Sequence, residues 1–354
     1  MRVGVIGTAG VGRAHVSALQ KVEDVDVVAI AGSTRESVDR AAAALHIPNA
    51  FVGGAQLIES GLVDAVHICT PNALHPADVR AAIDAAIHVV CEKPLSTDAQ
   101  IAYDLSKLDR RSSTRSTVCY HYRYAPLMQQ LVQIVQSGAL GDIHTVRATY
   151  LQNWQIDAAA TWRNDPEQAG PSRVLSDIGS HLLDLVEVAT GRQITRLEAR
   201  TQRRTPDRRS GDDDAAIATA QLRGGALASL VVSQISPAHM NSVTVELDGQ
   251  RGSASWALGD VESLKTVRTS DIASLRLDRH ESPTTAGRYW VSPVDANARL
   301  EALFQSFYGH LADGGVGRTA TITLPKLEDA ARHVRLIQQA VDGAMPLMDL
   351  NHSA

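Results

Sequence analysis

A chain of 354 residues is long enough for about two domains, each with its own apolar core. Its 34 basic and 39 acidic residues give a formal net charge of -5 and are scattered along the chain, which argues against nucleic acid as a partner. No apolar run approaches the roughly 20 residues of a membrane span, and the N-terminus enters a strand directly, so we expect a cytoplasmic protein that makes no membrane contact.

The first third of the chain alternates short Val- and Ile-rich runs with amphipathic stretches. This alternation is typical of parallel strands joined by crossover helices, so it predicts an α/β fold with a doubly wound parallel sheet. We assign residues 1–123 to this first domain, with Ser33 or Thr34 and Thr97 as helix caps. The predicted strands are 2–6, 25–30, 65–69, 87–92 and 117–122, and the predicted helices are 11–21, 35–45, 74–86 and 98–109.

The pattern changes after a helix at 126–137, which Pro126 can start. Period-two alternation then predicts an open, mainly antiparallel sheet in a second domain, 124–354, with a hairpin turn at Gly224-Gly225. We expect helices to cover one face of this sheet and to leave the other face for a partner subunit, in a homodimer or homotetramer. The last helix could also pack back on the first domain. The predicted strands are 143–152, 195–202, 215–222, 226–235 and 242–248, and the predicted helices are 180–190, 297–313 and 326–342.

The segment Arg203 to Asp214 joins two of these strands and mixes both signs of charge. A charged connection of this kind is typical of a solvated loop tip, and that is our prediction for it.

A glycine-rich turn follows the first strand, with the sequence Gly7-Thr8-Ala9-Gly10-Val11-Gly12. Gly7 permits a tight turn, and Gly12 lets the following helix pack closely on the sheet. The helix N-terminus then offers unpaired amides to a pyrophosphate, which predicts a bound dinucleotide. Ala9 stands where such turns normally have their middle glycine. A glycine turn without any ligand is the alternative.

The end of the second strand indicates which dinucleotide is bound. A free ribose 2'-hydroxyl is normally held by an acidic residue there, but this chain has Gly32 followed by Ser33-Thr34-Arg35. Small donors and a guanidinium suit a 2'-phosphate, which favours NADP over NAD. Alternatively, Ser33 or Thr34 only caps the helix and Arg35 is a solvated residue of its first turn.

Two further motifs carry the groups that alcohol oxidation needs. Lys93, in Glu92-Lys93-Pro94, lies at a strand end, and His181 follows Asp177 by one helical turn. When a secondary alcohol loses hydride, its hydroxyl proton must leave as well, and histidine titrates nearest working pH. Lys93 can donate to the substrate oxygen, while a carboxylate four residues earlier can orient the imidazole. A satisfied Asp-His pair on a helix surface is the alternative.

Together these motifs resemble the glucose-fructose oxidoreductase and inositol dehydrogenase family (Gfo/Idh/MocA), and the likeness covers nearly the whole chain. The resemblance implies a Rossmann domain, then an α/β domain with an open, mainly antiparallel sheet, a nicotinamide cofactor, and sugars, inositols or their keto forms as substrates. The residues that carry it are the glycine turn, Cys69-Thr70-Pro71-Asn72 with His75, Glu92-Lys93-Pro94, Tyr122-Arg123 followed by Pro126, Gly138-Ala139-Leu140-Gly141, and Asp177 through Asp184.

The resemblance also implies roles for single residues. Lys93 is the active-site lysine, Asp177 an assisting or substrate-binding carboxylate, and His181 the residue that transfers the proton. Pro94 follows a cis peptide bond that directs Lys93 into the cleft. The residues that line the nicotinamide side are Thr70, Pro71, Asn72, His75, Glu92 and Lys93.

Other candidates for substrate contact are weaker. Tyr122 and Arg123 follow the last strand of the first domain, where packing at the domain junction is an equal alternative. Trp154, Trp162 and Arg163 precede Asp177, and an indole face there could stack on a sugar or serve only as a packing anchor.

No metal site is expected, because the histidines do not pair with carboxylates or thiols at metal spacing. The three cysteines read as packed thiols. The leading hypothesis is an NADP- or NAD-linked oxidoreductase acting on a sugar, a cyclitol or a keto-sugar. A non-catalytic sensor that binds cofactor and sugar, and a nicotinamide-dependent glycoside-cleaving enzyme, are the alternatives.

Overall fold

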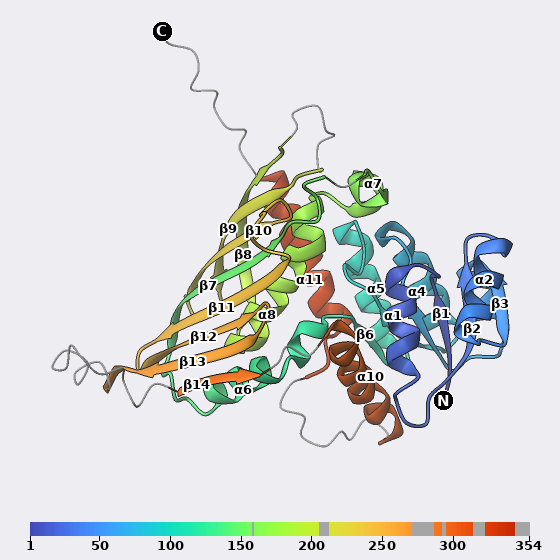
Figure 1. The fold of residues 1–354 in the computed structure, drawn as a ribbon, viewed down its shortest axis with the longest axis horizontal. Coiled ribbons are helices and arrows are strands. Elements are labelled where there is room, and N and C mark those ends of the chain that lie inside the picture. The colour runs from blue at the N-terminus through green and yellow to red at the C-terminus, as the bar shows by residue number, and fades with distance from the viewer. Residues whose placement is uncertain (158, 205–211, 271–286, 292–294, 314–322, 344–354) are drawn as a thin grey trace, which may run out of the picture.

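The computed structural model describes residues 1–157, 159–204, 212–270, 287–291, 295–313 and 323–343. Two sheets lie side by side, with long helices between them (Figure 1). The first is a six-stranded parallel sheet in the order β3-β2-β1-β4-β5-β6, and the second has eight strands in the order β14-β13-β12-β11-β7-β10-β9-β8. In the second sheet only the β7–β10 pair is parallel among the pairings described. The α/β class and both kinds of sheet are therefore as predicted.

The parallel sheet forms from near-continuous apolar runs because helices cover both of its faces. Every residue of β4 is buried, and so is β1 after its first residue. The sequence prediction missed β3 and α3, which are short. The elements are β1 Arg2–Ile6, α1 Gly10–Leu19, β2 Asp26–Gly32, α2 Arg35–Leu45, β3 Asn49–Val52, α3 Gly54–Glu59, β4 Ala65–Ile68, α4 His75–Asp84, β5 His88–Cys91, α5 Ala99–Arg111 and β6 Ser116–Val118.

Two local predictions in this half were wrong. The strand predicted at 117–122 ends at Val118, and the chain turns into the 3-10 helix His121–Tyr124. Asp98, not Thr97, caps α5, because its side chain accepts a hydrogen bond from the Ile101 N–H at 2.8 Å.

The eight-stranded sheet shows the alternation of a sheet that is buried on one face. Burial alternates residue by residue along β9, and the β9–β10 hairpin turns at Gly224 and Gly225, which have φ of +90° and +91°. The last three strands were not predicted. The elements are α6 Pro126–Gln136, β7 Ile143–Gln152, α7 Pro166–Ala169, α8 Ser180–Thr190, β8 Ile194–Gln202, β9 Ala215–Leu222, β10 Leu227–Ser233, β11 Asn241–Gly249, β12 Gly252–Leu258, β13 Glu262–Arg268, β14 Gly287–Val291, α10 Ala296–Ala312 and α11 Leu327–Asp342.

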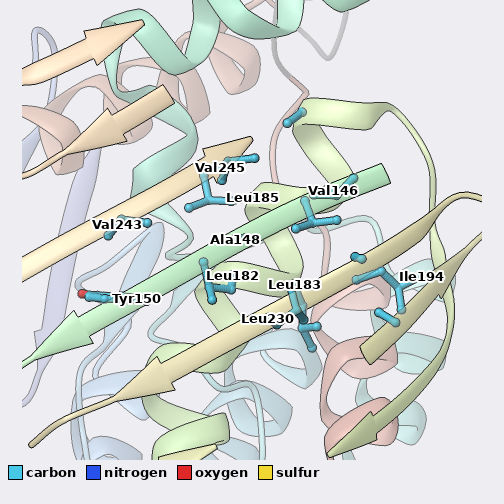
Figure 2. Packing of buried hydrophobic residues seen from close by; sticks show 14 of the residues in the cluster. Val146, Ala148, Tyr150, Leu182, Leu183, Leu185, Ile194, Leu230, Val243 and Val245 are labelled. Atoms are coloured by element: carbon cyan, nitrogen blue, oxygen red, sulfur yellow. The ribbon is translucent and has the colours of Figure 1, made fainter. Parts of the chain in front are cut away.

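Helix α8 lies against the buried face of this sheet. Its residues Leu182, Leu183 and Leu185 lie among side chains from β7, β10 and β11, such as Val146 and Leu230 (Figure 2). Burying side chains of this kind contributes roughly 1.5–3 kcal/mol each. The helix is therefore fixed on the sheet, and it begins directly after the turn that carries Asp177.

The prediction that three helices cover the eight-stranded sheet was wrong for α10. Leu303, Phe304 and Phe307 of α10 belong to the core of the parallel sheet, together with Val3 and Val5 of β1. A parallel sheet must be covered on both faces, and α10 lies beside α1 to complete that cover. α11 runs between α5 and the eight-stranded sheet (Figure 1). Among the residues described, no helix is both long and apolar enough to cross a bilayer.

Candidate active site

The turn between β1 and α1 leaves space for a ligand. Gly7 has φ of +126°, and a Cβ at Gly12 would lie 2.1 Å from the Gly7 carbonyl oxygen, so both positions need glycine. By contrast, a Cβ at Gly10 would meet nothing within 4 Å. Ala9 is exposed and caps α1 without a side-chain hydrogen bond. The amides at the start of α1 are thus uncovered, which fits a pyrophosphate despite the missing middle glycine.

The end of β2 explains why no carboxylate stands there. A Cβ at Gly32 would lie 2.9 Å from Cγ2 of Thr8, in the glycine-rich turn. Thr34 is the N-cap of α2 and accepts a hydrogen bond from the Ser37 N–H at 3.2 Å. The Arg35 guanidinium donates to Asp39 at 3.2 Å and to the Ala50 carbonyl at 3.1 Å. The capping role of Thr34 is thus observed, and Arg35 points along α2.

Lys93 and Asp177 meet across the two halves of the molecule. The Lys93–Pro94 peptide bond is cis, as the family resemblance implies. The Lys93 Nζ donates to the Asp177 carboxylate at 2.7 Å and to its carbonyl oxygen at 3.0 Å. Burial raises the pKa of Asp177, but the charges of Lys93 and Arg163 and hydrogen bonds from Lys93 and Gln234 bring it below its ordinary value. Asp177 is therefore ionised.

His181 is not oriented by Asp177, which corrects the expectation of an Asp-His pair one turn apart. The carboxylate of Asp177 is taken by Lys93 and by Gln234, whose amide donates to it at 2.7 Å. His181 Nδ1 is buried and has no hydrogen-bond partner among the described residues. Its ring lies edge-on to Tyr122, with the centroids 4.9 Å apart. Burial, and then the charge of Lys93, hold the pKa of His181 well below its ordinary value, so the imidazole is neutral.

A cavity of about 350 Å³ opens over these groups. Five of its lining residues were singled out from the sequence, and three were missed. Tyr150 and Gln152 could have been found, because the period-two alternation of β7 puts them on one face at the end of the strand. The cavity is lined by Lys93, Tyr150, Gln152, Trp154, Arg163, Asp177, Ile178 and His181.

Two of the weaker sequence candidates lie behind the cavity. Tyr122 is buried and its hydroxyl is 2.6 Å from that of Tyr150. Arg123 is also buried, where its Nε donates to both oxygens of Asp184 at 2.9 and 2.7 Å. These contacts match the packing alternative for both residues. Trp162 does not line the cavity. Its indole ring stacks on the guanidinium of Arg163, whose carbon is 4.4 Å from the ring centroid.

The Thr70 to His75 segment is tied to the Lys93 motif by backbone contacts. The two ring nitrogens of His75 are each 2.8 Å from a carbonyl oxygen, that of Pro94 and that of Thr70. The imidazole is fully buried, so it joins these two segments instead of lining a surface. The Asn72 amide donates to the Ala169 carbonyl at 3.0 Å. The buried Thr70 hydroxyl has no partner among the described residues.

A charged network supports Asp177 from behind. Gln234 links Asp177 to the guanidinium of Arg173, which also binds the carboxylates of Asp212 and Asp214. All four of these supporting residues are buried. The prediction that Arg203 to Asp214 is a solvated loop tip was therefore wrong for the last residues of the segment. Asp212 and Asp214 are buried because they form ion pairs with the buried Arg173. Residues 205–211 of that segment lie outside the described residues.

A second polar cluster lies behind Glu92. His15 Nε2 is 3.1 Å from the Glu92 carboxylate, His15 Nδ1 is 3.0 Å from His67 Nδ1, and His67 Nε2 is 2.8 Å from the Tyr308 hydroxyl. Burial raises the pKa of Glu92, but the hydrogen bond and charge of His15 bring it to about 2. His15, Glu92 and Cys119 also converge as a metal site would require. Sequence spacing could not show this convergence.

The cysteines are free thiols. Burial raises the pKa of Cys69, Cys91 and Cys119 well above the ordinary value, with the charge of Glu92 as the next cause. Each is therefore protonated, as expected for packed side chains.

A parallel sheet with an open glycine turn, beside a cavity with a lysine and a histidine, is the arrangement expected of a nicotinamide-dependent oxidoreductase. Two family models match the chain. The oxidoreductase family with an NAD-binding Rossmann fold matches residues 1–120, and the Gfo/Idh/MocA C-terminal domain matches residues 128–255. The chain belongs to the Gfo/Idh/MocA family of oxidoreductases.

Curated relatives of the chain include dehydrogenases of sugars and inositols. Levoglucosan dehydrogenase of Pseudarthrobacter phenanthrenivorans is 26% identical over 307 residues, which are 78% of each chain. Glucose-6-phosphate 3-dehydrogenase of Bacillus subtilis is 23% identical over 275 residues, 75% of this chain and 77% of the relative. Myo-inositol 2-dehydrogenase of Thermotoga maritima is 25% identical over 64% of this chain and 66% of the relative.

Solved structures share the whole fold. An oxidoreductase domain protein from Kribbella flavida has a TM-score of 0.82 and 26% identity, over 96% of this chain and 95% of that chain. Levoglucosan dehydrogenase in complex with NADH has a TM-score of 0.84 and 22% identity, over 97% of both chains. The second likeness shows the fold alone.

Proposed function

We propose that this protein transfers a hydride between NADP(H) or NAD(H) and a secondary alcohol or ketone of a sugar, an inositol or a keto-sugar. The observation that carries the proposal is the cavity in which the Lys93 ammonium, the ionised Asp177 and the neutral His181 meet. Lys93 follows β5 of the parallel sheet, whereas Asp177 and His181 belong to the other half of the molecule. The ion pair of Lys93 with Asp177 therefore connects the cavity to the half that would bind the dinucleotide. The curated relatives act on substrates of this kind, which supports the choice of substrate class.

The nicotinamide, when bound, takes up the hydride from the carbon that carries the hydroxyl. The residues of this chain handle the rest. The ammonium of Lys93 donates a hydrogen bond to the substrate oxygen and stabilises the negative charge that develops there. The neutral imidazole of His181 accepts the hydroxyl proton, because only an unprotonated ring can act as a base. Asp177 holds Lys93 in place. In the reverse direction the ketone oxygen needs a proton, which the ammonium of Lys93 can supply.

The phosphate-binding groups follow from the open turn. The amides of the glycine turn, from Gly7 to Gly12, would hold the pyrophosphate, and the uncovered start of α1 supports this. Thr70, Pro71 and Asn72 would lie at the nicotinamide end. Their position after β4, at the carboxyl end of a strand of the parallel sheet, supports this role.

The first test replaces the proton-handling residues. Lys93→Met and His181→Ala should each lower turnover by roughly 10²–10⁴-fold, the usual contribution of a positioned proton donor or acceptor. Binding of NADPH or NADH, followed by nucleotide fluorescence, should stay within a few-fold of the wild type. Lys265→Met, at an exposed lysine of β13, is the matched control and should leave turnover unchanged. Unchanged turnover in both active-site variants would contradict the proposal. Cofactor and sugar binding by a wild type without any turnover would favour a sensor.

We also propose that NADP(H) is preferred. No acidic side chain stands at Gly32 or Ser33 to bind a free 2'-hydroxyl or to repel a phosphate. The Arg35 guanidinium, about half exposed, would have to leave Asp39 to reach the phosphate. Parallel fluorescence titrations with NADPH and NADH test this, and Arg35→Ala should weaken NADPH binding about tenfold while sparing NADH, since one charge-assisted contact is lost. Tighter binding of NADH by the wild type would overturn this preference.

The uncovered face of the eight-stranded sheet is our proposed contact between subunits, in a homodimer or homotetramer. Ile217 on β9 and Leu227 on β10 are 64% and 60% exposed, which is unusual for large apolar side chains in two neighbouring strands. Light scattering after size-exclusion chromatography measures the mass in solution. Ile217→Lys should lower the assembled mass, and a wild type that is monomeric at all concentrations would refute the contact.

A further inference from the structure

Arg163 projects a cation into the substrate cavity from the short helix Trp162–Asn164. The helix begins with a capping box, in which the Thr161 and Asn164 side chains satisfy backbone groups at its start. The Arg163 guanidinium carbon lies 4.4 Å from the Trp162 ring centroid. Stacking on an indole holds a guanidinium by its face and leaves its N–H groups free to point outward. The position of this charge is therefore set by the local fold.

The other charges in the cavity cancel. Lys93 and Asp177 form an ion pair with 2.7 Å between Nζ and the carboxylate, and His181 is neutral. Arg163 makes no ion pair with any carboxylate in the part of the chain that the structure describes. Acidic side chains close to it in sequence and space are engaged elsewhere. Asp165 accepts the Glu167 N–H at the start of α7, and Asp212 accepts from Arg173 and Asn164. Counting only the residues that the structure describes, the cavity thus has one positive charge in excess.

We propose that the substrate is an anionic sugar or cyclitol, whose carboxylate or phosphate group is bound by Arg163. This inference rests on the proposed function and narrows its substrate class. A guanidinium offers paired N–H donors that match two oxygens of a carboxylate or phosphate, and such charge-assisted pairs are strong in a partly enclosed site. A neutral sugar would leave that charge without a partner. A cavity of about 350 Å³ has room for a single sugar ring with one such substituent.

A different function of Arg163 would be purely electrostatic. Its charge helps to bring the pKa of Asp177 below the ordinary value, so the arginine could act only by keeping Asp177 ionised. The two functions differ in their effect on substrates. Support for Asp177 would matter equally for neutral and anionic sugars, whereas direct binding would matter for the anionic ones.

The experiment compares three ring compounds that share a skeleton: D-glucose, D-glucuronate and D-glucose 6-phosphate. Wild-type kcat/KM should be at least tenfold higher for one of the two anions than for glucose. In Arg163→Gln the ratio of anionic to neutral kcat/KM should fall at least tenfold, mainly through KM, and Arg163→Lys should lie between. Which anion responds identifies the group as carboxylate or phosphate. An equal loss for all three sugars, or a wild type without anion preference, would overturn the inference.

A binding measurement separates this inference from the proposed function. Titration of each anion into the NADPH-loaded wild type, followed by tryptophan fluorescence, reports binding without turnover. Saturable binding that weakens at least tenfold in Arg163→Gln, and that weakens with added salt, supports the inference even if no sugar is oxidised. If sugars are turned over but neither anion binds more tightly than glucose, the inference fails and the proposed function stands.

Discussion

Glu92 and Lys93 are neighbours in the chain, but the buried side chains that stand behind Glu92 differ in kind from those behind Lys93. Behind Glu92 lies a row of rings, His15, His67 and Tyr308, with Glu92 as its one carboxylate. Behind Lys93 lies a network that is rich in charge, in which Gln234 connects Asp177 to Arg173 and its two aspartates. Both clusters are buried.

The row of rings behind Glu92 determines where protons lie, whereas the network behind Lys93 determines where a charge lies. An ionised Glu92 can only accept, so His15 donates to it from Nε2. Burial and then the charge of His15 lower the pKa of His67, and the hydrogen bond and charge of His15 lower the pKa of Glu92. Nδ1 of the charged His15 therefore also carries a proton and donates to His67 Nδ1, and the neutral His67 ring donates from Nε2 to the Tyr308 hydroxyl. The row thus fixes which ring nitrogens carry protons. The network behind Lys93 fixes the place of a charge instead. Its carboxylates and guanidinium are stable in the interior only as a set.

The largest expected effect comes from breaking that set. Arg173→Met removes the buried guanidinium that binds both Asp212 and Asp214, and removing one partner of a buried charge network costs about 3–5 kcal/mol of unfolding free energy. Arg147→Met is the matched control, because Arg147 also binds two carboxylates but is 47% exposed. Its loss should cost less than about 1 kcal/mol. If urea unfolding gave the same loss of unfolding free energy for both variants, the buried ion pairs would contribute no more to stability than the exposed ones.

The second effect is on stability in acid. The folded pKa of Glu92 is about 2 against an ordinary value of 4.5, so this depressed pKa stabilises the fold above pH 4.5, and that stabilisation is lost as the pH falls from 4.5 towards 2. In His15→Phe the main cause of the depression is absent, so burial is opposed only by the charges of Lys93 and His121 and the pKa of Glu92 is higher than in the wild type. The stability gap between wild type and variant should therefore narrow across that window. Urea midpoints at several pH values measure it, and a constant gap would contradict the assignment.

The third effect is on turnover. Gln234→Leu removes the hydrogen bond to Asp177 at 2.7 Å, and we expect kcat to fall about tenfold, the cost of losing roughly 1.4 kcal/mol of positioning. The lost bond favours the ionised form of Asp177, so the pKa of Asp177 should rise and the acidic limb of the pH–kcat profile should move to higher pH. A lower kcat without that movement would mean that Gln234 affects turnover without controlling the ionisation of Asp177.

The smallest effect is expected at the far end of the row of rings. Tyr308→Phe removes one hydrogen bond to His67, which should cost about 1 kcal/mol of unfolding free energy and leave kcat within twofold. Tyr103→Phe, at a tyrosine that is 44% exposed, is the control. A tenfold loss of kcat in Tyr308→Phe would break the comparison, because it would show that the row carries protons and does not only fix orientation.

The elements predicted most accurately from the sequence are those with a clear hydrophobic period or a local motif. The strand at 143–152 matches β7 residue for residue, since period-two alternation marks a sheet with one buried face. β3 is as short as β4 and β5, which were predicted, but its residues are only half-buried and do not form the buried apolar run of those two strands. The amphipathic pattern of α10 does not tell which sheet the helix covers.

Contacts between distant residues could not be read from the sequence. Asp177 was expected to orient His181 four residues on, but its carboxylate binds Lys93, 84 residues away. Likewise nothing in the sequence distinguishes Arg173 and Asp212 from solvated charges, because only the folded chain brings them together. His67 and Tyr308 are 241 residues apart, and their pairing depends on where α10 packs.

The contact between Gly32 and Thr8 constrains how cofactor preference can evolve. A carboxylate at the end of β2 is the common way to select NAD, but a Cβ at Gly32 would stand 2.9 Å from Thr8 Cγ2. Gly32→Asp alone therefore crowds the Thr8 methyl group, the Cβ of Val38 at 3.3 Å and the Ser37 hydroxyl at 3.4 Å, and Thr8→Ser would relieve only the first of these contacts. A carboxylate at this position would therefore displace side chains of both the glycine turn and α2, so a change of cofactor preference there is coupled to the packing of both segments.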